Sequence, residues 1–177
     1  MPKNRTQGVI FGILMSMTMA YGMEVYNVAW KMGYPVMAGG FSNMTNEVFL
    51  AALMEAAYMW LFVFLFSSLW GNRLGSHMAS RYVTPKKDSA FMCGTVRACC
   101  TVLVMCPTMS LVASILFSVI LAGSPLGQLP AIWVGTTIKN FPMALLWNLF
   151  AAGPLSRLAF RTFFSHVGDA SEVPATA

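Results

Sequence analysis

Residues 139–160 read KNFPMALLWNLFAAGPLSRLAF, and residues 55–76, which lie 84 positions earlier, read EAAYMWLFVFLFSSLWGNRLGS. When the two stretches are aligned, apolar residues occupy matching positions. An arginine lies near the end of each stretch, Arg73 in the first and Arg157 in the second. A weaker match, at a spacing of 90 residues, links the apolar segments that precede them. Internal repeats decide architecture, so the chain is predicted to contain one two-helix unit twice.

The composition is that of a membrane protein. Of 177 residues, 57% are hydrophobic and only 10% are charged, and the mean hydropathy is +0.64. A soluble globule of this size needs more polar surface. A helix that crosses a bilayer needs roughly 20 apolar residues. Four stretches are long enough: Val9–Trp30, Val48–Trp70, Cys99–Leu121 and Ile132–Leu155.

The positive charges predict the orientation of these spans. Lysine and arginine near span ends are retained on the cytoplasmic side. They precede the first span, follow the fourth, and fill the connection between the second and third, whereas the other two connections contain only Lys31. Both termini are therefore expected in the cytoplasm. The net charge of +5 reflects this topology and an attraction to anionic lipid headgroups, and does not indicate nucleic-acid binding.

The expected fold is all-α, with four transmembrane helices formed by two parallel two-helix repeats. Each unit crosses the membrane twice, so both units insert in the same orientation and their pseudo-twofold axis follows the membrane normal. The predicted organisation is a first unit at 1–83, a basic cytoplasmic linker at 84–97, a second unit at 98–167 and a disordered tail at 168–177.

Three charged residues fall within the spans at one depth. Glu55 lies 18 residues before Arg73, Lys139 lies 18 before Arg157, and Glu24 lies 19 after Arg5. At about 1.5 Å per helical residue, each is near the outer edge of a hydrocarbon core roughly 30 Å thick. Charged groups in spans usually pair with one another or face a wet cavity, which makes this layer the candidate site.

The layer has three interpretations. An ion pair between Glu55 and Lys139 across the pseudo-twofold axis, with Glu24 as a second acid, could form a structural clasp. The same groups could bind a solute or a proton. They could also snorkel to the outer headgroups. Supporting polar residues are Asn27, Asn140 and the deeper Asn148, and a single asparagine in a span often holds helices together.

Pro107 and Pro142 lie inside the third and fourth spans and predict helix kinks. Each proline removes one backbone hydrogen bond and frees the carbonyl four residues earlier, at Leu103 and Ile138. A freed carbonyl in a bundle can coordinate a cation, although neighbouring helices commonly satisfy it.

Other classes of site have little support. No nucleophile with a base, phosphate loop or acidic metal cluster is present, so the chain is not expected to be an enzyme and no cofactor or metal is predicted. The four cysteines are interpreted as packing residues in preference to a metal or redox site, and the fifteen methionines as lipid-facing residues in preference to the lining of an apolar ligand groove. Gly8 with Gly12 and Ala52 with Ala56 are small-residue pairs that predict close packing in the bundle, or alternatively a homodimer contact.

Several short strings are shared with a known family. They are MPKN at 1–4, GVIF at 8–11, GMEVYN at 22–27, NFPMAL at 140–145 and GPL at 153–155. Through them the chain resembles the bacterial membrane proteins grouped as domain-of-unknown-function family 2798, which often carry two copies of a two-helix domain. The resemblance implies a bacterial inner-membrane location and a helical fold, and it implies no activity.

Two functions are therefore expected from the sequence. One is a small proton- or cation-coupled transporter of a small solute or amphiphile. The other is a structural or accessory membrane subunit held by an intramembrane glutamate–lysine clasp.

Overall fold

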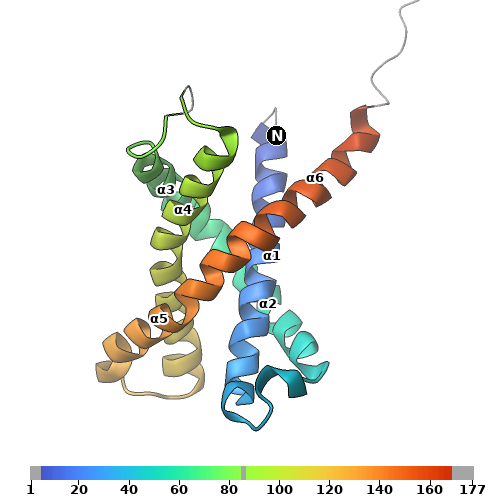
Figure 1. Cartoon of the computed structure of the whole chain (residues 1–177). Coiled ribbons are helices and arrows are strands. Elements are labelled where there is room, and N and C mark those ends of the chain that lie inside the picture. Colours follow the sequence, from blue (N-terminus) through green and yellow to red (C-terminus); the bar gives the residue numbers. More distant parts are fainter. Residues whose placement is uncertain (1–4, 85–86, 169–177) are drawn as a thin grey trace, which may run out of the picture.

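A computed structural model describes residues 5–84 and 87–168 of the chain, and this part is helical without a strand. Four helices are long and apolar enough to cross a membrane (Figure 1). This confirms the predicted all-α class and the four spans. The spanning segments are Thr6–Lys31, Glu47–Ala79, Ala90–Leu121 and Leu126–Phe164.

Each span after the first includes a π-helical stretch, where the helix is locally wider. The longer elements are α1 (Arg5–Lys31), α2 (Glu47–Phe66), the π segment η3 (Ser67–Gly71), α3 (Asn72–Ala79), α4 (Ala90–Ala113), the π segment η4 (Ser114–Leu121), α5 (Leu129–Trp147), the π segment η6 (Asn148–Ala152) and α6 (Gly153–Gly168). Short 3₁₀ turns η1 (Tyr34–Val36), η2 (Gly40–Asn43) and η5 (Leu126–Gln128) complete the connections.

The expected spans match the helices closely at one end and less closely at the other. Near the outer loops Trp30, Val48 and Leu121 lie within one residue of the ends of α1, α2 and η4, whereas Ile132 lies three residues after the start of α5. At the basic end the helices continue beyond the apolar runs, as α3, α6 and the first turns of α4. Amphipathic sequence there sustains a helix that apolar length alone does not predict.

The expected linker at 84–97 is correspondingly shorter in the structure. The helix α4 begins at Ala90, and Ser89 caps it by accepting a hydrogen bond from the backbone N–H of Met92 at 3.2 Å. Serine is a preferred cap because its oxygen satisfies an N–H that has no partner in the helix. The predicted disordered tail beyond Gly168 lies outside the described residues.

The start of α1, the end of α6 and the connection between α3 and α4 lie at the same end of the bundle (Figure 1). The two remaining connections, which contain η1, η2 and η5, lie at the opposite end. This is the arrangement that an even number of spans per unit requires.

The helices exchange contacts reciprocally between the two predicted units. Within units, α1 packs on α2 and α4 packs on α5. Between units, α3 packs on α4 and α6 packs on α1, so each unit extends the end of its second span onto the first span of the other (Figure 1). A pseudo-twofold axis would generate this exchange, although the repeat itself stays a prediction.

Two small cores hold the bundle, and each belongs to one predicted unit. One core joins the outer parts of α1 and α2 and contains Val28, Ala29, Tyr34, Val48 and Ala52. The other joins α4 and α5 and contains Val102, Cys106 and Ala144. The buried residues of each core thus come from one unit, but the partly buried Met23 of α1 packs against the second core and joins it to the first unit.

Close helix approaches depend on glycines other than those of the predicted small-residue motif. A methyl group on Gly22 would lie 2.0 Å from the ring of Trp147, whereas one on Gly8 would meet nothing within 4 Å. The Trp147 indole N–H donates to the carbonyl of Thr18 at 3.0 Å and ties α5 to α1. Ala52 and Ala56 are buried as predicted, but Gly8 faces away from the described bundle.

We expect Gly22→Ala to destabilise the bundle by about 1–3 kcal/mol, because the added methyl displaces Trp147 and breaks its hydrogen bond. Thermal unfolding in detergent, monitored by circular dichroism, measures the effect. Gly8→Ala is the matched control on the same helix and should not destabilise, since alanine is the better helix former. Equal melting temperatures for the two variants would contradict this packing.

Candidate functional site

The charged groups of the outer layer gather around the ends of α1, α2 and α5. Glu24 of α1 lies within electrostatic range of Glu55, Lys31 and Lys139. Two carboxylates and two ammonium groups therefore balance when all are ionised. Glu24, Glu55 and Lys139 are the residues predicted for this layer, whereas Lys31 is predicted only as part of an outer connection.

The ion pair of Glu55 differs from the expected one. Its partner is Lys31, whose Nζ lies 2.7 Å from Oε2 and 2.9 Å from Oε1 of Glu55. The predicted ion pair between Glu55 and Lys139 across the two units is therefore wrong, because the lysine that pairs with Glu55 is Lys31. Two equivalent positions in a repeat are related by rotation about the pseudo-twofold axis. They are in contact only when they lie close to that axis. Lys31, at the end of α1, reaches Glu55 within the first unit.

The Lys31–Glu55 pair also contacts the second unit through an aromatic ring. Lys31 Nζ lies 3.8 Å from the centre of the Phe117 ring in η4. A cation over an aromatic face is stabilised by the negative potential of the ring. The side chains of Lys31 and Glu55 are 45% and 23% exposed, so the pair lies at the rim of the bundle.

Lys139 is held by different contacts. Its Nζ lies 5.8 Å from the centre of the Trp30 ring, at the edge of cation–π range. The Tyr26 hydroxyl donates to the Lys139 backbone carbonyl at 3.2 Å. Both contacts join α5 to α1, so Lys139 contributes to the interface between the units without forming the predicted pair with Glu55.

Glu24 is the most deeply buried of the four charged groups. It is 3% exposed, and its Oε2 atom has no hydrogen-bond partner. Asn140 of α5 is 5% exposed, and its Oδ1 atom also lacks a partner. Buried polar groups are normally hydrogen-bonded, and each exception calls for an explanation. Both residues were predicted as site residues from sequence.

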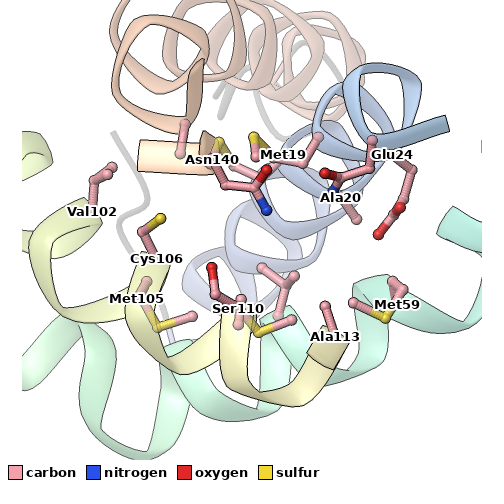
Figure 2. Close-up of a pocket in the computed structure, with 15 residues that line it drawn as sticks. Met19, Ala20, Glu24, Met59, Val102, Met105, Cys106, Ser110, Ala113 and Asn140 are labelled. Atoms are coloured by element: carbon pink, nitrogen blue, oxygen red, sulfur yellow. The ribbon is translucent and has the colours of Figure 1, made fainter. Parts of the chain in front are cut away.

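These two residues line a cavity of about 90 Å³ at the centre of the bundle. Helices α1, α2, α4 and α5 all contribute to its wall. Figure 2 shows Glu24 and Asn140 on one side of this space and Met59, Met105, Ser110 and Ala113 on the other. The full lining is Met19, Ala20, Met23, Glu24, Asn27, Met59, Val63, Val102, Met105, Cys106, Met109, Ser110, Ala113, Asn140 and Ala144.

The other predicted polar residues have separate places. Asn27 lines the cavity with Glu24, one helical turn further along α1. Asn148 is buried in η6, outside the cavity lining. The structure therefore brings together Glu24, Asn27 and Asn140, and it leaves Asn148 apart from them.

Both prolines lie inside continuous helices, Pro107 in α4 and Pro142 in α5. The residues whose carbonyls they free, Leu103 and Ile138, are exposed on the outside of the bundle. These carbonyls are therefore poorly placed to coordinate a solute in the cavity. The Trp133 indole N–H donates to the carbonyl of Pro107 itself at 2.8 Å and joins α5 to α4. The kinks themselves stay predictions.

No family model, curated protein or solved structure matches this chain. The site is accordingly argued from its own geometry. Sequence reasoning identified the acid and two asparagines of the cavity, because polar residues in apolar spans are conspicuous. It missed the methionine wall, because methionine in a span has the same signature whether it faces lipid or a cavity.

A double-mutant cycle tests the observed ion pair. Lys31→Met and Glu55→Gln should each lower stability, with a coupling energy of up to about 1 kcal/mol, as for other partly exposed pairs. The effects of Glu55→Gln and Lys139→Met should add without coupling, since these side chains do not pair. Thermal unfolding of the single and double variants in detergent measures both cycles. Coupling in the second cycle alone would restore the pair predicted from the repeat.

Proposed function

We propose that the chain is a small transporter that carries a small cationic solute across a bacterial inner membrane in exchange for protons. Glu24 is the group that carries the exchange. The observation behind this proposal is that Glu24 lines a cavity to which all four spans contribute, and that its buried Oε2 atom has no hydrogen-bond partner. Repeat-built transporters commonly bind their substrates at the interface between their repeats.

The exchange follows from the chemistry of a buried carboxyl group. A carboxylate in an apolar interior is costly unless a cation or several hydrogen-bond donors compensate its charge. A proton and a cation each provide that compensation, and they compete for the same oxygen atoms. Binding one releases the other, which couples cation movement to proton movement.

The size of the cavity favours a small solute over an amphiphile. Pockets for drug-sized ligands enclose about 300–1,000 Å³. The cavity has about 90 Å³, room for a few water molecules or one dehydrated ion with its protein ligands. Of the two substrate classes expected from the sequence, the small solute is the one that this volume accommodates.

The alternative function is a non-transporting structural or accessory subunit. It is favoured by the Lys31–Glu55 pair and its contact with Phe117, which hold the outer ends of three spans together. In that role Glu24 would serve only to balance the charge of the neighbouring lysines. Removing its charge would then change stability and leave no transport activity to lose.

The proposed membrane and orientation rest on the distribution of charge. Seven described basic residues, Arg5, Arg73, Arg81, Lys87, Arg97, Arg157 and Arg161, lie toward the end of the bundle where α1 starts and α6 finishes. We propose that this end faces the cytoplasm and contacts anionic headgroups.

We also propose membership of domain-of-unknown-function family 2798. The shared string at 22–27 contains Glu24 and Asn27, and the string at 140–145 contains Asn140 and Ala144. All four of these residues line the cavity.

The transport proposal predicts that Glu24→Gln folds normally but abolishes proton-coupled flux. Proteoliposomes that contain a pH-sensitive dye, challenged with a panel of monovalent and divalent cations, measure this flux. Glu47→Gln is the matched control, because Glu47 is exposed at the outer start of α2. Wild-type flux in the glutamine variant at position 24, or no wild-type flux with any cation, would exclude the mechanism.

The orientation is tested with a membrane-impermeant maleimide on intact spheroplasts. Wild-type protein should remain unlabelled, because Cys93 and Cys99 lie at the end assigned to the cytoplasm. Ser42→Cys, in the exposed turn η2, should become labelled. The reverse pattern would invert the topology.

A further inference from the structure

Sulfur atoms dominate the wall of the central cavity. Five of the fifteen methionines in the chain line it, together with one cysteine. Met19 and Met23 of α1 are four residues apart, as are Met105 and Met109 of α4, and such spacing places both members of a pair on one helix face. Met59 of α2 and Cys106 of α4 complete the set (Figure 2).

These side chains form an unusual ligand set. Thioether and thiolate sulfur are soft donors that select Cu(I) over hard divalent ions. Among the described residues no group of three or more histidine, cysteine, aspartate or glutamate side chains could hold a metal ion. The borderline ion Zn²⁺ and the hard ions Mg²⁺ and Ca²⁺ therefore lack their preferred ligands here.

Two oxygen atoms in the same wall point independently to a cationic ligand. The Glu24 carboxylate and the Asn140 amide are at least nine-tenths buried and line the cavity, and each has an oxygen without a partner. An anionic oxygen and an amide dipole stabilise a positive charge that enters an apolar space. A single carboxylate balances a monovalent ion.

The sulfur atoms of the wall differ in how freely they could turn toward a bound ion. Met105 packs its sulfur beside Gly71, where a methyl group would lie only 2.3 Å from it, so Met105 is less free to turn toward the cavity. The Cys106 thiol lies 3.9 Å from the carbonyl oxygen of Thr137, a weak hydrogen bond. Methionine has three rotatable bonds and adapts to irregular spaces, which makes Met19, Met23, Met59 and Met109 the adaptable donors of the wall.

We infer that this cavity is a binding site for a soft monovalent metal ion of the Cu(I) class. The ligands would be drawn from Met19, Met23, Met59, Met109 and Cys106, with Glu24 as the compensating charge. The inference rests on the proposed function in that this ion would be the transported cation. Binding itself can be measured without transport, so the two can fail separately.

The test uses Ag(I), which has the same charge and soft character as Cu(I) and does not change oxidation state during the titration. The full-length protein in detergent is titrated in competition with a chromophoric thioether chelator. Three cysteines outside the cavity, of which Cys93 and Cys99 are partly exposed and Cys100 is buried, are removed by Cys93→Ser, Cys99→Ser and Cys100→Ala, because thiols elsewhere in the chain also bind silver. Cys106 remains.

We expect one tightly bound Ag(I) per chain, with sulfur neighbours in its X-ray absorption spectrum. Met19→Leu with Met23→Leu, and separately Met59→Leu with Met109→Leu, should weaken binding by about tenfold or more, because each pair removes donors and conserves volume. Met17→Leu with Met54→Leu is the matched control on α1 and α2, since both methionines are exposed to lipid. This control should bind like the wild type.

The outcomes separate the inference from the proposed function. Equal silver affinity in all the leucine variants, or no tight binding, would overturn the metal site. Proton-coupled flux of a different cation together with absent silver binding would overturn the metal site alone. Silver binding that depends on the cavity methionines would support the site even if no flux were found, and the absence of flux would then count against transport.

Discussion

The rest of the candidate site depends on one constraint, the position of the Glu24 carboxyl group among four apolar helices. Within a bilayer, a buried charge must be paired, neutralised or exposed to a polar cavity. Lys31 is already paired with Glu55, and Lys139 is held against Trp30 and Tyr26. The Oε2 atom of Glu24 has no hydrogen-bond partner, and Glu24 is the one charged residue among those that line the cavity.

One core lies away from that space, and the buried residues of the other, Val102, Cys106 and Ala144, form part of its wall. Helices α1 and α2 pack on each other in one core, and α4 and α5 in the other, while the units meet mainly through α3 on α4 and α6 on α1. These contacts between the units lie toward the basic end of the bundle, and the Lys31–Phe117 contact closes the opposite end. Contacts at both ends of the bundle therefore fix the helices, and the cavity lies between these contacts.

Much of the fold follows from the sequence, because apolar length and basic residues are physical requirements of a membrane span. The four helices and the outer ends of α1 and α2 could be predicted by counting apolar residues. The partner of Glu55 could not, since a repeat gives equivalent positions and not distances. The contact at Gly22 could not be predicted either, because any glycine in a span indicates close packing. Only the structure shows that Trp147 occupies the space that a side chain at position 22 would need.

The central claim is that the Glu24 carboxyl exchanges a proton for a cation, and infrared difference spectroscopy of the purified protein measures this directly. On addition of a cation that drives proton flux in proteoliposomes, or of Ag(I) if it binds, we expect the loss of a protonated carboxyl C=O band and the gain of carboxylate bands, both absent in Glu24→Gln. A wild-type spectrum in which no carboxyl band responds to the cation, or one whose change persists in the glutamine variant, would contradict it.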